Sequence, residues 1–174
     1  MSIHVTVGPM FAGKTSYIRN LVSKYNIIRV PTLLITHPYG RDKLSWMQHR
    51  AEIESLTDLE PLFLHQYKVI IIDEAQFFPG IKEFARRMAD DYNKDVYVVG
   101  LDGDCDRKAF GEVLQCIPLA DSVTKLTAFC ERCANGTPAI FTFRRNDDHG
   151  QQIMPGGFES YGALCRECWL HAEV

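Results

Sequence analysis

Short runs of apolar and mostly β-branched residues punctuate the first hundred positions of the chain. Such runs are typical of strands buried on both faces of a parallel sheet, and they predict strands at residues 3–7, 32–36, 69–72 and 95–100. Between them, two segments carry apolar side chains at helical spacing with charged side chains on the opposite face, residues 16–24 and 81–92. Strands alternating with helices predict an α/β fold with a mostly parallel sheet.

The stretches between these elements are less regular. Residues 37–50 are polar and contain turn formers; they form either a loop on the ligand side of the sheet or a plain surface loop. Residues 51–65 mix short helix and strand signals. Residues 101–111 form a polar, glycine-bearing loop after the fourth predicted strand, and residues 113–127 carry apolar spacing that leads to the first cysteine pair.

Composition narrows the class of protein. The chain has 174 residues, of which 46% are hydrophobic and 24% charged, as expected for one domain or one domain with a small appendage. A net charge of −3 gives no basic field that favours nucleic acid. No apolar run approaches the roughly 18–20 residues of a membrane helix, and no signal-peptide layout opens the chain. We therefore expect a cytoplasmic protein with neither a nucleic-acid nor a membrane partner.

A phosphate-binding motif follows the first predicted strand. The segment Gly8-Pro9-Met10-Phe11-Ala12-Gly13-Lys14-Thr15 fits G-x-x-x-x-G-K-[ST] at every fixed position. Between a strand and a helix, the backbone N–H groups of such a loop cradle phosphate oxygens, and the helix N-terminus adds partial positive charge. Lys14 then reaches the outer phosphates and the Thr15 hydroxyl can ligate Mg²⁺. The alternative is a chance match in a turn.

Two carboxylates follow the buried run at residues 69–72. A strand that ends in an acid beside a P-loop delivers that acid to Mg²⁺, which gives Asp73 this role; the alternative is an ordinary helix start. Glu74 projects away from Asp73 if the strand continues, and it is a candidate general base. Phe77 and Phe78 come next, either as core residues or as a platform for a flat ligand.

Four of the six cysteines form two C-x-x-C pairs, at residues 130/133 and 165/168. In a reducing compartment, two matched pairs predict a tetrahedral zinc site, with a redox pair as the alternative. The zinc role is structural because protein ligands fill all four positions. The pairs enclose residues 135–162, a long segment without obvious packing, which is typical of a functional or disordered loop. Cys105 and Cys116 stand alone as ordinary core or surface thiols.

In combination these motifs resemble one family, the type II (cellular and poxvirus-type) thymidine kinases. The resemblance covers nearly the whole chain, from the P-loop through the acid pair with its phenylalanines to both cysteine pairs. Further matching segments are Leu101-Asp102-Gly103, Arg107-Lys108-Ala109-Phe110-Gly111, residues 123–128, and Gly156-Gly157 with Tyr161. The resemblance implies a P-loop kinase domain over residues 1–126 and a zinc-binding and lasso-loop domain over residues 127–174.

The resemblance also implies an activity, transfer of the ATP γ-phosphoryl group to the 5′-hydroxyl of thymidine or deoxyuridine, with Mg²⁺ and a structural Zn²⁺. Glu74 matches the catalytic base of the family. The implied cofactor-binding residues are Gly8, Pro9, Met10, Phe11, Ala12, Gly13, Lys14, Thr15, Ser16, Asp73, Gln76 and Arg41. The implied nucleoside-binding residues are Met10, Phe77, Leu101, Phe110, Met154, Gly156, Gly157 and Tyr161, and the implied zinc ligands are Cys130, Cys133, Cys165 and Cys168. Family members are typically homotetramers inhibited by thymidine triphosphate; a homodimer is the alternative here.

Two positions depart from the pattern of the family. Cys105 stands where the family often has an aromatic residue, which changes one wall of the base pocket. The family often has Asp-x-Arg-Tyr after the second strand; here the stretch is Tyr39-Gly40-Arg41-Asp42, so Arg41 aligns and Asp42 is the candidate for the displaced acid. Two rival functions remain, a zinc-bearing ATPase switch that binds nucleic acid or a partner, and a kinase of another deoxynucleoside or nucleotide.

Overall fold

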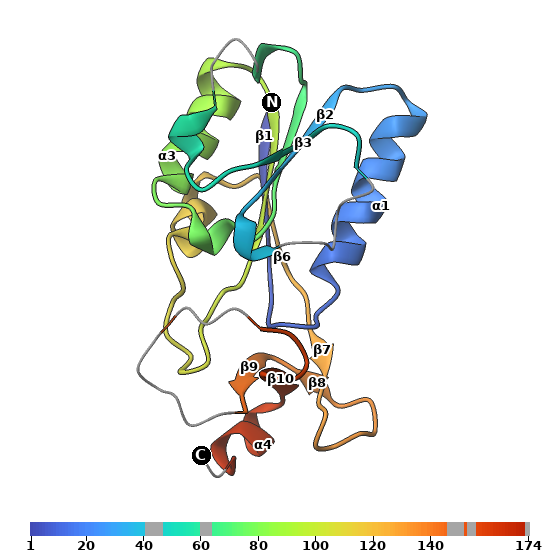
Figure 1. Cartoon of the computed structure of the whole chain (residues 1–174), viewed down its shortest axis with the longest axis vertical. Helices are drawn as coiled ribbons and strands as arrows, with labels where there is room; N and C mark the ends of the chain where they lie inside the picture. Colours follow the sequence, from blue (N-terminus) through green and yellow to red (C-terminus); the bar gives the residue numbers. More distant parts are fainter. Residues whose placement is uncertain (41–46, 60–63, 146–151, 153–155, 173–174) are drawn as a thin grey trace.

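The computed structural model describes residues 1–40, 47–59, 64–145, 152 and 156–172. Within these residues, six parallel strands form a central sheet in the spatial order β3-β2-β4-β5-β1-β6. Their bounds are β1 Ser2–Val7, β2 Thr32–Thr36, β3 Arg50–Glu52, β4 Val69–Ile72, β5 Asp95–Gly100 and β6 Ser122–Lys125. The predicted α/β fold with a mostly parallel sheet is therefore confirmed (Figure 1).

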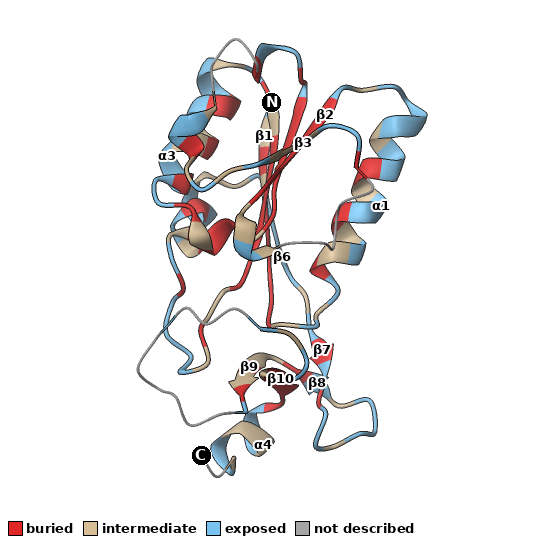
Figure 2. Ribbon diagram, viewed as in Figure 1, coloured by how far each residue is buried: buried red, intermediate tan, exposed pale blue. Residues whose placement is uncertain are grey.

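Strand β4 shows why the apolar runs are continuous rather than alternating. All of its residues are buried. Ile70 and Ile72 belong to the hydrophobic cluster that contains the buried side chains of α3, whereas Val69 and Ile71 belong to the cluster that contains those of α1. Because successive strand residues point to opposite faces, a strand covered on both faces needs an apolar residue at every position. Figure 2 shows the buried residues along the strands and on the facing sides of the helices.

Helices cover both faces of the sheet (Figure 1). Helix α1 (Lys14–Ile27) covers one face; α3 (Ile81–Arg86), its π-helical continuation (Arg87–Asp91) and a 3₁₀ helix (Val113–Leu119) cover the other. Both predicted helices are confirmed, although α1 extends beyond the predicted residues at both ends. Among the described residues, no helix has the length and apolar content needed to cross a membrane.

Residues 51–65, where the sequence signals were mixed, contain the last two residues of β3 and a complete 3₁₀ helix. Strand β3 pairs with β2 at the edge of the sheet, in the register Leu34↔Arg50, and its residues are only partly buried or exposed. The 3₁₀ helix Leu56–Asp58 is capped at its N-terminus by the Ser55 hydroxyl, which accepts from the backbone N–H of Thr57. A short edge strand exposes most of its side chains, so it has no apolar run for the sequence pattern to reveal.

The C-terminal module lies at the carboxyl ends of the sheet strands (Figure 1). It contains the hairpin β7 (Ala128–Phe129) with β8 (Pro138–Ala139), the antiparallel pair β9 (Phe141–Arg144) with β10 (Tyr161–Leu164), and the short helix α4 (Arg166–Leu170). The expectation that residues 135–162 lack packing was therefore wrong at both ends of that segment. Ala139, near the start of the segment, is buried in a small hydrophobic cluster, and Tyr161, near its end, is also buried.

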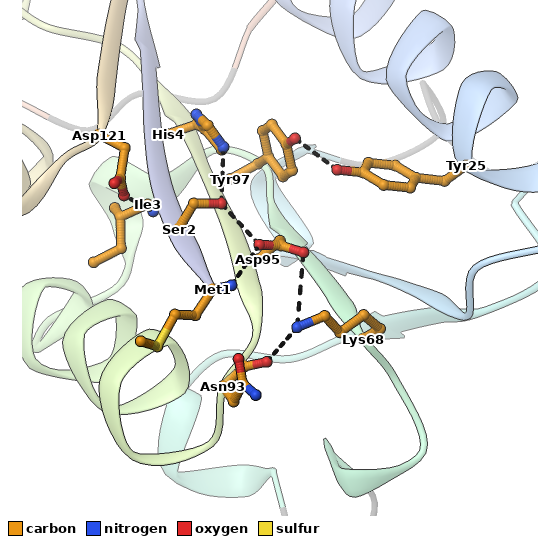
Figure 3. A network of polar contacts seen from close by, with 10 residues as sticks. All are labelled: Met1, Ser2, Ile3, His4, Tyr25, Lys68, Asn93, Asp95, Tyr97 and Asp121. Carbon is orange, nitrogen blue, oxygen red and sulfur yellow. Dashed lines mark hydrogen bonds and ion pairs between the residues drawn. The ribbon is translucent and has the colours of Figure 1, made fainter. Parts of the chain in front are cut away.

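The opposite end of the sheet, where β1 and β5 begin, carries a network of polar contacts (Figure 3). Asp95 accepts a hydrogen bond of 2.8 Å from the Ser2 hydroxyl, and its carboxylate lies 3.2 Å from the N-terminal ammonium group of Met1 and 3.9 Å from Lys68 Nζ. Burial alone would raise the pKa of Asp95, but the hydrogen bond from Ser2 and the ammonium group outweigh it and lower the pKa. The ionised carboxylate thus joins the starts of β1 and β5.

Candidate active site

A cavity of about 440 Å³ opens where the carboxyl ends of β4 and β5 and the loop after β1 meet the C-terminal module. Ligands of open α/β sheets bind at this edge, because the loops that follow the parallel strands converge there. Every sequence segment to which we assigned chemistry, other than the cysteine pairs, contributes residues to its wall.

The P-loop connects β1 to α1 along a path that requires glycine. A Cβ at Gly8 would stand 2.5 Å from the backbone oxygen of Leu126, so the loop passes that segment at a distance that only glycine allows. Gly13 has φ 81, in the left-handed region. Its carbonyl accepts a hydrogen bond of 2.9 Å from the backbone N–H of Tyr17 at the start of α1. Gly13 therefore turns the chain abruptly from loop to helix.

The predicted phosphate-binding residues divide into two groups. Those on the cavity wall are Met10, Phe11, Gly13, Lys14 and Thr15. Gly8, Pro9 and Ala12 lie outside the wall, and Ser16 is exposed. Lys14 is buried, and its Nζ donates to the carbonyl oxygens of Gly8 at 3.0 Å and Pro9 at 2.7 Å. A cation and a helix N-terminus therefore meet on the cavity wall, an arrangement that favours anion binding.

The acid pair lies at the end of β4. Asp73 is buried, and its backbone N–H donates to the carbonyl oxygen of Ile35 on β2. The strand ends at Ile72, so the condition under which Glu74 would project away from Asp73 is not met. Glu74 instead adopts the left-handed conformation with φ 51, and its backbone N–H donates to Asp73 Oδ1 at 2.9 Å. Both carboxylates lie on the cavity wall.

Gln76 fixes the carboxylate of Glu74. Its Nε2 donates to Glu74 Oε2 at 2.7 Å, and its Oε1 accepts from the backbone N–H of Leu101 at 3.0 Å. The neighbouring chain passes closely on two sides: a Cβ at Gly100 would stand 2.7 Å from Gln76 Oε1, and one at Gly111 would stand 2.3 Å from the Gln76 backbone oxygen. Gln76 is buried, so its amide has one defined orientation.

An aromatic wall faces the cavity beside the acid pair. Phe77 packs edge-on against Tyr39 and Phe110, with ring centroids 5.2 Å and 5.5 Å away, and all three line the cavity. Phe78, in contrast, is buried in the core beneath α3. Of the two adjacent phenylalanines, Phe78 is therefore a core residue and Phe77 lines the cavity. Leu101 and Cys105 also line the cavity.

His37 lies behind this wall. Its ring centroid is 5.1 Å from that of Phe77 and 5.4 Å from that of Phe78. Burial lowers the pKa of His37 from its usual value, against the opposing effect of the carboxylates of Glu54 and Glu74. The neutral imidazole is therefore favoured behind the aromatic residues.

A second polar group on the wall was missed from the sequence. Arg144 is buried, and its Nη2 lies 3.4 Å from the Tyr161 hydroxyl and 3.3 Å from the backbone oxygen of Gln152. Gln152 Nε2 donates to Asp104 Oδ2 at 2.7 Å. Thr142 lines the cavity with them, and its hydroxyl accepts from the backbone N–H of Met10 at 3.1 Å. Thr142 and Arg144 are the two buried residues of β9. Because every second residue of a strand points to the same face, this alternation is the sequence signal that could have placed both side chains on one face.

The lasso segment is described only in part. Gly156 and Gly157, predicted to contact the nucleoside, lie on the cavity wall with the buried Tyr161. The predicted residues Arg41 and Met154, and the candidate acid Asp42, lie outside the described residues.

The two cysteine pairs converge in the C-terminal module. The sulfur atoms of Cys130, Cys133, Cys165 and Cys168 all lie within 4.8 Å of one another. Cys133 Sγ is 3.8 Å from Cys165 Sγ and 3.5 Å from Cys168 Sγ. A tetrahedral zinc with Zn–S bonds of about 2.3 Å separates its sulfur ligands by about 3.8 Å, so the cluster fits a zinc ion.

Backbone donors also point at this cluster. Burial would raise the pKa of the Cys130 thiol, but N–H groups of Cys165, Cys133 and Arg132 outweigh it and lower the pKa, whereas hydrogen bonds with the neighbouring sulfur atoms raise the pKa of Cys168. Cys165 Sγ accepts from the backbone N–H of Cys168 at 3.5 Å. Such donors stabilise thiolates, which are the form that binds zinc.

Comparison with known proteins identifies the family. A family model described as thymidine kinase matches residues 1–169. "Thymidine kinase a" of Arabidopsis thaliana is 42% identical over 183 residues, covering 97% of this chain and 75% of its own length. The thymidine kinase of myxoma virus (strain Uriarra) is 38% identical, and that of vaccinia virus (strain Western Reserve) is 35% identical; each alignment covers 97% of this chain and 96% of the viral protein. The chain belongs to the thymidine kinase family.

Membership of the thymidine kinase family confirms both the resemblance inferred from the motifs and the predicted enzyme class, a kinase-type transferase. In this member of the family, the cavity wall combines two chemically different sets of residues. The α1 N-terminus with Lys14 and Thr15 offers donors and positive charge to an anion. The aromatic residues Tyr39, Phe77 and Phe110 offer an apolar surface to a flat ring. The carboxylates of Asp73 and Glu74 line the same cavity.

Proposed function

We propose that this protein transfers the γ-phosphoryl group of ATP to the 5′-hydroxyl of thymidine, giving thymidine monophosphate in pyrimidine salvage. One observation carries the proposal: a single cavity combines a P-loop, two carboxylates at the end of a buried strand and an aromatic wall. Phosphoryl transfer needs a donor and an acceptor held in line, with little covalent chemistry by the protein.

Glu74 is the proposed general base. It accepts the proton of the 5′-hydroxyl as that oxygen bonds to the γ-phosphorus, while the bond to the β-phosphate oxygen breaks and ADP leaves. Gln76, which the family resemblance placed with the cofactor-binding residues, acts here by orienting this carboxylate. Its amide donates to Glu74 Oε2 at 2.7 Å and so holds one carboxylate oxygen of the proposed base.

The P-loop residues of the cavity wall are proposed to bind ATP. Backbone N–H groups of the P-loop, Lys14 and the N-terminus of α1 bind the phosphate oxygens. Thr15 and Asp73 would hold Mg²⁺, since a hydroxyl and a buried carboxylate on one cavity wall are the oxygen ligands it prefers. When bound, Mg²⁺ neutralises charge on the transferring phosphoryl group.

The apolar and aromatic residues of the cavity wall are proposed to bind the nucleoside. Met10, Phe77, Leu101 and Phe110 enclose the thymine ring, Tyr161 contacts the sugar, and the lasso at Gly156 and Gly157 closes over both. One methyl group in an apolar pocket changes binding by only about 1–3 kcal/mol. Deoxyuridine is therefore a second substrate, and Cys105, smaller than an aromatic residue, leaves room beside the base.

The cysteine cluster is proposed to bind a structural Zn²⁺ that anchors both ends of the lasso. We also propose a division into a kinase domain over residues 1–126 and a zinc and lasso domain over residues 127–174, which is supported by the end of β6 at Lys125 and the start of β7 at Ala128. From the family resemblance alone we further propose a homotetramer, or a homodimer, in the cytoplasm.

Incubation with γ-labelled ATP and thymidine tests the function. The label should appear in thymidine 5′-monophosphate, with deoxyuridine as a comparable acceptor and uridine as a much poorer one, because the 2′-hydroxyl must fit beside Tyr161. Release of the label as free phosphate, without transfer to any nucleoside, would instead identify an ATPase and contradict the proposal.

A further inference from the structure

Two aromatic side chains join the P-loop to the lasso. The rings of Phe11 and Phe158 are stacked, with centroids 4.1 Å apart and an interplanar angle of 15°. Phe11 adopts φ 63 within the P-loop, and both residues line the cavity. Although stacked, Phe158 is 71% exposed, so it contributes little to the core. A large apolar side chain held at the surface against one specific partner points to a role in the site rather than in folding.

The backbone of Phe158 is fixed from the other side. Its carbonyl oxygen accepts a hydrogen bond of 2.9 Å from Arg145 Nε, and the backbone N–H of Arg145 donates to the carbonyl oxygen of Ser160 at 2.9 Å. The Arg145 guanidinium makes two further hydrogen bonds, of 2.8 Å and 2.7 Å, to the two carboxylate oxygens of Glu131. This bidentate pairing gives the arginine a single orientation.

Glu131 ties these contacts to the cysteine cluster, because it lies between Cys130 and Cys133 in the first C-x-x-C pair. Its carboxylate lies directly over Gly162 of β10, where a Cβ would stand 2.3 Å from Glu131 Oε2. A continuous series of contacts therefore runs from the cysteine pair through Glu131, Arg145 and Phe158 to Phe11 in the P-loop.

We propose that Phe158 is a positioning residue that couples binding of the nucleoside beside Gly156 and Gly157 to the conformation of the P-loop. This inference rests on the proposed function, because it needs a nucleoside under the lasso and ATP at the P-loop. A nucleoside in contact with Gly156 and Gly157 strengthens the packing of the Phe158 ring against Phe11, and this packing favours the P-loop conformation that binds phosphate. By reciprocity, ATP favours binding of the nucleoside to the same extent.

The size of the coupling follows from the contact that transmits it. An aromatic pair contributes an interaction equivalent to about a twofold to tenfold change in an equilibrium constant. We therefore expect thymidine to bind about twofold to tenfold more tightly in the presence of a non-hydrolysable ATP analogue with Mg²⁺ than in its absence.

The test measures the thymidine Kd with and without the analogue by titration calorimetry, for wild type and for a set of variants. Phe158→Ala and Phe11→Ala should each reduce the ratio of the two Kd values to about one, and the double variant should change it no further. Phe158→Tyr keeps a stacking ring and should restore the ratio. Phe129→Ala is the matched control, because Phe129 is 74% exposed on the same module and lies outside the cavity wall.

A variant at Glu131 tests the contacts that hold the backbone of Phe158 through Arg145. Glu131→Gln keeps the size of the side chain but loses the bidentate ion pair with Arg145, so it should lower the Kd ratio while the zinc content stays at the wild-type value. If the variant loses zinc and its Kd ratio also falls, Glu131 acts by stabilising the cysteine cluster, and this step is overturned.

The outcomes separate this inference from the proposed function. Wild-type protein that phosphorylates thymidine but shows a Kd ratio of one overturns the inference and leaves the function intact. A ratio that survives Phe158→Ala overturns the role of Phe158. Wild-type protein that binds no thymidine removes the proposed function and the inference with it.

Discussion

Gln76 Nε2 donates a 2.7 Å hydrogen bond to Glu74 Oε2, and through its other amide atom Gln76 accepts from the backbone N–H of Leu101. The amide thus connects the acid pair after β4 to the loop after β5. Because Gln76 is buried and closely approached by Gly100 and Gly111, the carboxylate of Glu74 has a fixed direction. A fixed carboxylate is preorganised for the proton transfer that we propose for Glu74.

Gln76→Glu should shift the pH dependence of the reaction. The new carboxylate keeps an acceptor for Leu101 but stands within hydrogen-bonding distance of Glu74, so the two carboxyl groups share protons and the ionisation of the pair needs a higher pH. The acid limb of the kcat/KM profile should move upward by about one pH unit or more. Gln115→Glu, at an exposed position off the cavity wall, adds the same charge and should leave the profile unchanged.

Gly111→Ala should damage both stability and turnover. Gly111 has φ 61, and a Cβ there would stand 2.3 Å from the Gln76 backbone oxygen, so the substitution displaces the segment that orients Glu74. Gly80→Ala is the control, since Gly80 has φ 77 but open space around its Cβ position. The control should lose only about 1–2 kcal/mol of stability. Equal melting temperatures and equal kcat values for the two variants would show that the close approach has no consequence.

The central elements were predictable because burial on both faces leaves a continuous apolar run. Strand β4 is the plain case, and the P-loop and cysteine motifs were equally readable because each fixes residue types at fixed spacing. Edge strand β3 was not predictable: pairing with β2 on one side only places no demand on its side chains.

Parts of the site could not be predicted for a different reason. Arg144 and Asp104 are far apart in the sequence, and only the tertiary structure places both beside Gln152. The sequence likewise could not separate Phe77 from Phe78. The backbone turn that begins at Glu74 decides which ring faces the cavity and which enters the core.

Removal of the proposed zinc should loosen the lasso more than it affects the P-loop. Elemental analysis of wild-type protein should find one zinc ion per chain, and Cys133→Ser should lose it. Because ordering one residue costs about 1–2 kcal/mol, KM for thymidine should rise by about tenfold or more, and KM for ATP by less. Cys116→Ala, outside the cluster, should retain zinc. Full activity of metal-free protein after chelation would contradict the structural role.

The network at the start of β1 and β5 predicts a pH-dependent contribution to stability. The pKa of Asp95 is lowered in the folded protein, so its stabilising effect is complete above the unfolded pKa of about 3.9 and is lost as the pH falls through the folded pKa. Asp95→Asn should lower Tm by about 2–4 °C at pH 7, and by less below pH 4. Asp90→Asn removes an exposed charge and should change Tm little. A difference between Asp95→Asn and wild type that does not depend on pH would exclude the ionised carboxylate as its cause.

The most direct test of the account is the rate of phosphoryl transfer by Glu74→Gln. The substituted amide keeps the shape of the side chain and an oxygen for the Gln76 donor, but it cannot accept the proton of the 5′-hydroxyl. With ATP and thymidine saturating, kcat should fall by about 10²- to 10⁴-fold while the Kd for ATP stays within about twofold of wild type. A kcat within twofold of wild type would contradict the assignment of Glu74 as the base, and with it the proposed chemistry of the cavity.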